Sequence, residues 1–108
     1  MTKIADNLNI PELGQQDDAI VRAYWDSDGA EIIYFELAPG KSILRQVMPV
    51  DVCLYVLDGI GEIEIGGVSA SISPHIVIES PAGTPANISN CGDEPFRFLV
   101  IEQPSAVF

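Results

Sequence analysis

The sequence predicts an all-β domain, either a sandwich or a closed barrel of short strands. Short apolar runs follow one another along the chain, and clusters of Gly, Pro, Asp and Asn separate them at regular intervals. No segment shows a sustained helical period. A length of 108 residues and a hydrophobic fraction of 47% are sufficient for one buried core.

Nine strands are expected, each lying between turn residues. The first four apolar runs end at Asp-Ser-Asp-Gly, Pro-Gly, Pro and Asp-Gly. The fifth run, Gly-Glu-Ile-Glu-Ile, alternates most clearly, and Gly66-Gly67 after it predicts a tight hairpin. The last run places two phenylalanines on one face. The expected strands are 19–25, 31–37, 41–48, 52–57, 61–65, 68–72, 75–78, 84–89 and 96–102.

Charge and composition narrow the possible partners. Residues 1–18 are polar and predict an N-terminal arm, with room for one short strand, before a single domain at 19–108. The net charge of −11 repels phosphate backbones and anionic membrane surfaces, so neither nucleic acid nor membrane is expected as a partner. The chain shows no signal peptide and no membrane-spanning apolar window. We therefore expect a cytoplasmic protein with reduced Cys53 and Cys91.

Three turn motifs carry a resemblance to a known family. Pro39-Gly40, the run Tyr-Val-Leu-Asp-Gly-Ile-Gly at 55–61, and Pro81-Ala82-Gly83 together resemble the cupin family. Cupins are double-stranded β-helix barrels of the jelly-roll type, and the resemblance covers roughly residues 30–102. It implies a cupin-type jelly-roll barrel.

The residues that hold a metal in most cupins are replaced in this chain. The family usually supplies three histidines and one glutamate, and the motifs that start at Gly40 and Pro81 show which residues stand in those positions. They are Gln46, Met48, Val52 and Ala86. An amide, a thioether and two alkyl groups do not suit Fe, Mn, Ni or Zn, so neither a metal nor another cofactor is expected. His75, the only histidine, falls outside these positions, at a rim or turn.

If the barrel forms, alternation along its strands predicts an apolar interior pocket. Gln46 and Asn90 would be its main hydrogen-bonding groups, which suits a small, mostly apolar ligand. Simple core packing is an equal alternative. The expected pocket residues are Leu44, Gln46, Met48, Val52, Leu54, Val56, Ala86, Ile88 and Asn90.

The aromatic residues predict self-association. One small interior cannot hold all of Tyr34, Phe35, Tyr55, Phe96 and Phe98, so some must face outward from a sheet. Many cupins form dimers through such a face, and we expect a homodimer.

Three functional hypotheses follow. The leading one is a metal-free cupin-like barrel that binds a small, mostly apolar molecule or acts as a dimeric accessory or sensing module. The second is a metal-independent isomerase, cyclase or lyase that uses Tyr34, Tyr55 or His75 as an acid-base group. It requires a titratable side chain inside the barrel. The third is a structural interaction domain with a filled interior. The sequence leaves open whether the protein is an enzyme.

Overall fold

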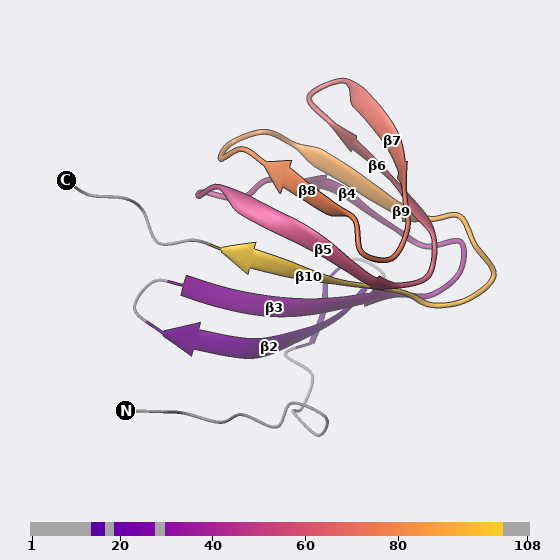
Figure 1. Ribbon diagram of the computed structural model, residues 1–108, viewed down its shortest axis with the longest axis horizontal. Helices are drawn as coiled ribbons and strands as arrows, with labels where there is room; N and C mark the ends of the chain where they lie inside the picture. The colour runs from indigo at the N-terminus through magenta and orange to yellow at the C-terminus, as the bar shows by residue number, and fades with distance from the viewer. Residues whose placement is uncertain (1–13, 17–18, 28–29, 103–108) are drawn as a thin grey trace.

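The computed structural model describes residues 14–16, 19–27 and 30–102, which form two β-sheets (Figure 1). No helix in this described part of the chain is long and apolar enough to cross a membrane. The all-β prediction is confirmed. The strands are β1 Gly14–Gln16, β2 Ala19–Ser27, β3 Ala30–Leu37, β4 Ser42–Gln46, β5 Val52–Asp58, β6 Gly61–Ile65, β7 Val68–Ile72, β8 Val77–Ser80, β9 Ala86–Asn90 and β10 Phe96–Glu102.

The strands cross between the sheets in the jelly-roll manner. One sheet has the order β1-β2-β3-β10-β5-β8, and the other has the order β4-β9-β6-β7. Every paired neighbour is antiparallel. No ladder between described residues joins the two sheets, so they form a sandwich and not the closed barrel that we expected. The jelly-roll prediction itself is confirmed.

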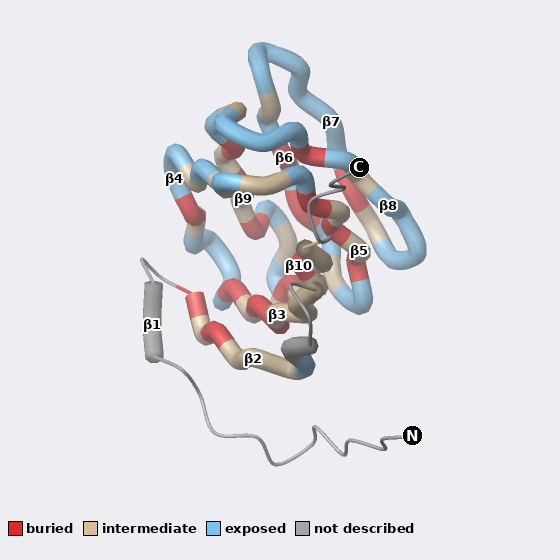
Figure 2. The backbone as a smooth tube through the Cα atoms, turned by 90° about the vertical axis from the view of Figure 1, so that its left-hand side faces the viewer, coloured by how far each residue is buried: buried red, intermediate tan, exposed pale blue. Residues whose placement is uncertain are grey.

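The core lies between the two sheets, as the buried segments in Figure 2 show. Alternate residues of β10 supply Phe96, Phe98 and Val100, all 6% exposed or less. The ring of Phe98 stacks on that of Phe35 in the neighbouring strand β3, with 5.3 Å between centroids. Burial of such large rings contributes much of the hydrophobic stabilisation of a small domain.

Several strand bounds differ from the prediction: the expected strand 19–25 extends to Ser27, the expected strand 84–89 lies at Ala86–Asn90, and two further differences affect the site. The expected strand 41–48 is shorter, Ser42–Gln46, and its register with β9 shifts. The expected strand 75–78 begins later, at Val77, because His75 lies in a turn with a φ of 73°. In that turn the Ile76 N–H donates to the Ser73 carbonyl at 3.2 Å. A positive φ interrupts the extended backbone of a regular strand.

The expected arm, residues 1–18, is described only at β1. This strand pairs with β2, in a register that sets Gly14 opposite Val21. Residues 1–13 and 17–18 lie outside the described residues. The hairpin at Gly66-Gly67 is confirmed, with φ angles of 55° and 82° between β6 and β7.

Candidate functional site

The four side chains at the usual metal-ligand positions of cupins line one cavity between the sheets. They are Gln46, Met48, Val52 and Ala86. Gln46 ends β4 and pairs with Ala86, the first residue of β9, while Val52 begins β5 in the opposite sheet. The tertiary structure thus brings together residues that are far apart in the sequence.

A β-bulge turns Gln46 toward the cavity. The ladder between β4 and β9 pairs Ile43 with Ile88 and then Gln46 with Ala86, so β4 carries one extra residue. Arg45 takes a positive φ of 55° at this point. Because of the extra residue, Gln46 lies on the same face of β4 as Ile43 and not as Leu44. Ile43 faces the core, and Leu44 is 64% exposed. Our expectation that Leu44 faces inward was therefore wrong.

The cavity measures about 20 Å³, which is room for about one water molecule. Its wall is almost entirely apolar. Among its described lining residues none is acidic, basic, a thiol or a phenol. The lining residues are Phe35, Ile43, Gln46, Met48, Val52, Leu54, Ser80, Ala86, Ile88, Phe98 and Val100.

Two further residues that we expected in the pocket are buried elsewhere. Val56 is fully buried in the core but does not line the cavity. Asn90 is 3% exposed and holds a turn together. Its Nδ2 donates to the carbonyls of Leu37 and Glu94 at 2.9 and 2.8 Å, and its Oδ1 accepts from the Gly92 N–H at 2.9 Å. These bonds use both amide donors and one acceptor site of the oxygen, so Asn90 is a structural residue.

Several lining residues were missing from the sequence prediction. Alternation along β10 could have found Phe98 and Val100, which share a face with Phe96. The bulge concealed Ile43. Ser80 lies two residues after Ile78, so their side chains are on the same face of β8. The expected strand ended at residue 78, and Ser80 was therefore not considered.

The donor set at the four positions does not fit a transition metal. The Gln46 Nε2 donates to the Met48 sulfur at 3.4 Å, so the two polar groups face each other. Val52 and Ala86 have no lone pair to offer. Among the described residues no three His, Cys, Asp or Glu side chains gather into a possible metal site. Hard and borderline cations prefer carboxylate and imidazole ligands, which are not present at these four positions.

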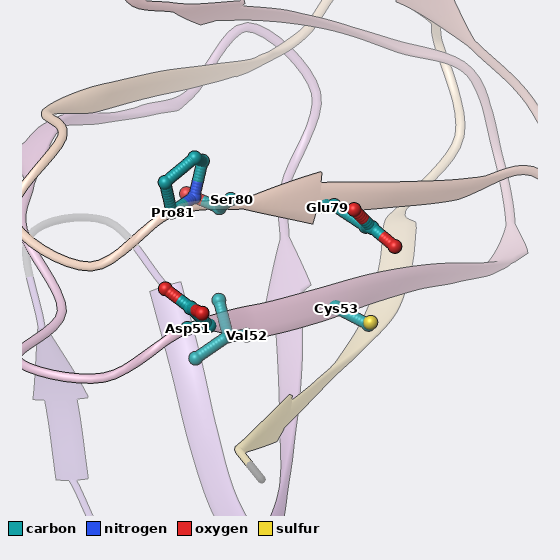
Figure 3. A pocket seen from close by; sticks show the side chains of 6 residues that line it. All are labelled: Asp51, Val52, Cys53, Glu79, Ser80 and Pro81. Carbon is teal, nitrogen blue, oxygen red and sulfur yellow. The ribbon is translucent and has the colours of Figure 1, made fainter. Parts of the chain in front are cut away.

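A second hollow, a surface cleft of about 180 Å³, lies beside the cavity (Figure 3). It is formed where β5 begins and β8 ends. Asp51 lies at one end, while Cys53 and Glu79, which are paired across the two strands, lie at the other. The lining residues are Asp51, Val52, Cys53, Glu79, Ser80 and Pro81.

The acid-base candidates Tyr55 and His75 lie outside the cavity. Tyr55 has the opposite parity from the core residues Leu54 and Val56, so its side chain is on the outer face of the six-stranded sheet. There the Tyr55 hydroxyl is 3.0 Å from His75 Nδ1. Neither residue lines the cavity, so they are not placed for chemistry in the interior.

Tyr34 in β3 is in register with Leu99 and Tyr55, so its side chain also lies on the outer side of the six-stranded sheet. Its hydroxyl donates to Glu36 Oε1 at 2.7 Å. Burial, together with that hydrogen bond and the nearby carboxylate charge, raises the pKa of the Tyr34 phenol well above its ordinary value. Arg97 bonds the same Glu36 oxygen at 3.3 Å and Asp58 at 2.9 Å. Exposed ion pairs of this kind contribute little to stability.

Comparison with known proteins agrees with the observed topology. A family model described as a cupin domain matches residues 33–102. No curated protein matches the chain.

Many solved structures share this fold. A predicted oxalate decarboxylase from Thermotoga maritima is 18% identical with a TM-score of 0.81, over 92% of this chain and 96% of that one. The polyketide cyclase RemF from Streptomyces resistomycificus is 22% identical with a TM-score of 0.79, over 94% of this chain and 79% of that one. A conserved protein of unknown function from Streptococcus pyogenes is 22% identical with a TM-score of 0.73, over 98% of both chains. At such identities the likeness concerns the fold.

Proposed function

This chain belongs to the cupin family, and we propose that it binds a small, mostly apolar molecule between its two sheets without a metal. One observation carries the proposal. The four positions that usually hold metal ligands still converge on one cavity, but they supply Gln46, Met48, Val52 and Ala86. The chemistry of these side chains suits an apolar ligand with a single polar group better than a cation.

The cavity must enlarge to admit such a molecule, since it now has room for about one water. Gln46 and Met48 are half-buried, and a thioether is a weak hydrogen-bond acceptor. The hydrogen bond between them is therefore weak. Methionine has three rotatable bonds and adapts readily to a new neighbour. We propose that these two side chains move aside when the ligand enters. Because the described lining offers no acid-base group, binding is better supported than catalysis.

Titration with the neutral fluorescent probe N-phenyl-1-naphthylamine tests this proposal. The wild-type protein should bind the probe saturably. Ala86→Phe should abolish binding, because the added ring fills the cavity. Ala70→Phe, on the exposed strand β7, is the matched control and should bind as the wild type does. Circular dichroism would establish that both variants fold. The proposal fails if the wild type does not bind, or if Ala86→Phe binds equally well.

Metal analysis tests the metal-free part separately. Untagged protein should lose Fe, Mn, Ni and Zn on dialysis, because an amide and a thioether bind these ions weakly. Any of these metals at near one equivalent after dialysis would contradict the proposal.

We also propose that the chain forms a homodimer through the outer face of its six-stranded sheet, as an accessory or sensing module would. One row on that face runs in register across four strands and contains Leu99, Tyr55 and Val77, with Tyr34, which is only 6% exposed, at its buried end. Val77 is 59% exposed, and apolar faces of this kind often form interfaces between subunits.

Light scattering coupled to size-exclusion chromatography measures the subunit number. We expect a dimer for the wild type and a monomer for Val77→Lys. Val68→Lys provides a matched control, because Val68 is 71% exposed on β7 in the other sheet. A monomeric wild type, or equal effects of the two substitutions, would exclude this interface.

A further inference from the structure

We infer that the free edge of β7 takes up an extended segment of a partner protein as a further strand, one in which apolar residues alternate with lysine or arginine. The segment pairs with Val68–Ile72 and covers an apolar groove beside them. Three observations support the inference: the edge is unprotected, the groove is apolar, and the outer face of β6 next to it is acidic. The groove shares no lining residue with the interior cavity, so the inference does not depend on the proposed function.

β7 is an edge strand without the usual protection against pairing. It pairs with β6 on one side, and no described strand pairs with its other side. Its sequence, Val-Ser-Ala-Ser-Ile, contains no proline and no charge, its ladder with β6 has no bulge, and residues 68–71 are all exposed (Figure 2). The opposite edge of the same sheet, β4, has both a bulge and the charged Arg45. Such devices normally keep an edge from pairing, so their absence from β7 suits it to a partner strand.

The two-residue turn before β7 determines which of its backbone groups are free. Such a turn makes Ile65 and Val68 a hydrogen-bonded pair, and hydrogen-bonded pairs alternate with non-bonded pairs along an antiparallel ladder. The backbone N–H and C=O groups of Ser69 and Ser71 therefore point away from β6. An added strand bonds to these groups, as in other cases of strand addition.

A groove of about 240 Å³ adjoins the inner side of β7. It lies between β6 and β7 of one sheet and β8 of the other, and its only charged lining residue among those described is Glu79. Residues directly opposite each other in a ladder point to the same face, so every second residue of an added strand lies beside Val68 and Ala70. Val68 is 71% exposed, and covering it removes apolar surface from water. These partner residues are therefore apolar. The lining residues are Ile63, Ile65, Val68, Ala70, Ile78 and Glu79.

The outer side of β7 favours a basic partner. Ser69 lies opposite Glu64 in β6. Ser71 lies opposite Glu62. Both carboxylates are exposed, and β6 and β7 contain no lysine, arginine or histidine. An added strand lies two strand spacings, about 10 Å, from β6, and the short serines leave that space to the long side chains of lysine or arginine. The remaining partner residues are therefore basic.

The same charges disfavour a second copy of this chain as the occupant. If two β7 strands paired, Glu62 and Glu64 of both copies would lie on one face of the joined sheet, with only serines between them. Like charges on one face repel each other, whereas a basic segment is attracted. The net charge of −11 adds a general attraction for a basic partner.

Fluorescence anisotropy with three labelled peptides of equal length tests the inference. The first alternates valine and lysine, and the second alternates valine and glutamate. The third has the composition of the first, with its valines and lysines in two separate blocks. The first should bind about tenfold more tightly than either of the others, because it alone matches both sides of β7. The inference fails if the first peptide does not bind, or if the third binds equally well.

Variants of the edge and of the acidic face test the two parts separately. Ser71→Pro should abolish binding, because proline removes the outward N–H but no bond to β6. Ser71→Ala keeps that N–H and should bind as the wild type does. Glu62→Gln with Glu64→Gln should weaken binding about fivefold, whereas Asp93→Asn with Glu94→Gln, which removes two exposed charges elsewhere, should not. Wild-type affinity in Ser71→Pro, or equal losses in the two double variants, would overturn the inference.

Hydrogen exchange measured by NMR identifies the occupied edge without any variant. The first peptide should slow the exchange of the Ser69 and Ser71 amides about tenfold and leave that of Ala70, which already bonds to β6, nearly unchanged. Binding without protection of the two serine amides would place the peptide elsewhere and contradict the inference. Protection in the free protein that disappears on dilution would identify a second copy as the occupant, and the inference would then be wrong.

Discussion

Gly61 in β6 has no space for a side chain. A Cβ at this position would lie 2.7 Å from the Phe96 ring and 2.7 Å from the Ser89 carbonyl oxygen. Gly61→Ala should therefore lower the free energy of unfolding by about 1–3 kcal/mol, the usual cost of overpacking a core. Chemical denaturation measures the change. Gly92→Ala is the control, because its nearest atoms are 3.6 Å away. Equal effects at the two sites would contradict this account of Gly61.

The high pKa of Tyr34 predicts how stability depends on pH. In the unfolded chain this phenol loses its proton near its ordinary value of 10.0, whereas in the folded protein burial and Glu36 keep the proton bound. Its stabilisation is therefore complete below pH 10 and is lost as the pH rises above that value. Melting temperatures between pH 9 and 11 should fall less steeply for Tyr34→Phe than for the wild type. A slope for Tyr34→Phe equal to that of the wild type would refute the prediction.

Single residues were predictable from the sequence where their role is local. The Asp58-Gly59 turn after the expected strand 52–57 is an example, since Gly59 has a φ of 90° in the structure. Asn90 was predicted less well. Its spacing in the motif suggested a pocket residue, but its amide bonds Leu37, which lies 53 residues earlier in the chain. No local pattern reveals a partner at that distance.

At the scale of elements, the bulge in β4 decides which side chain the cavity receives. The Arg45 N–H donates to Asn87 Oδ1 at 2.7 Å, and Asn87 Nδ2 donates to Glu64 Oε1 at 2.9 Å. These bonds link β4, β9 and β6 on the outer side of the sheet. We expect them to hold Arg45 at its positive φ, which costs a non-glycine residue energy.

Asn87→Ala should loosen this bulge. The Arg45 amide would lose its acceptor, so its hydrogen exchange should become at least tenfold faster, as NMR can measure. Glu64→Gln keeps an oxygen that can accept from Asn87 and should leave that rate nearly unchanged. If Arg45 exchanges equally slowly in Asn87→Ala, the clamp does not hold the bulge.

The position of β8 shows why strand boundaries were harder to predict than strand existence. The apolar run at 75–78 has strong β propensity. In the structure His75 instead closes a turn, where its N–H donates to the Val56 carbonyl at 3.0 Å, and the strand shifts to Val77–Ser80. This contact with β5 overrides the local preference. The shift matters for the site because it turns Ser80 inward.

At the scale of the whole molecule, the net charge of −11 opposes folding through self-repulsion. Salt screens this repulsion, so raising NaCl from 10 to 200 mM should increase the melting temperature by about 4 °C, which corresponds to roughly 1 kcal/mol. Differential scanning calorimetry measures this shift. The double variant Glu62→Gln with Asp93→Asn should show a smaller increase. A melting temperature that is independent of salt would show that the charge is already balanced locally.

The sequence by itself determined the class of the fold, the positions of most turns and the loss of the usual metal ligands. These properties depend on residue type and on near neighbours in the chain, as with Gly66-Gly67 or with Val52 and Ala86. The tertiary structure alone decided that Gln46 and not Leu44 faces the cavity, that the interior is nearly filled, and that Asp51 and Glu79 share a cleft. Each of these depends on contacts between strands distant in sequence, whose register only the folded sheets fix.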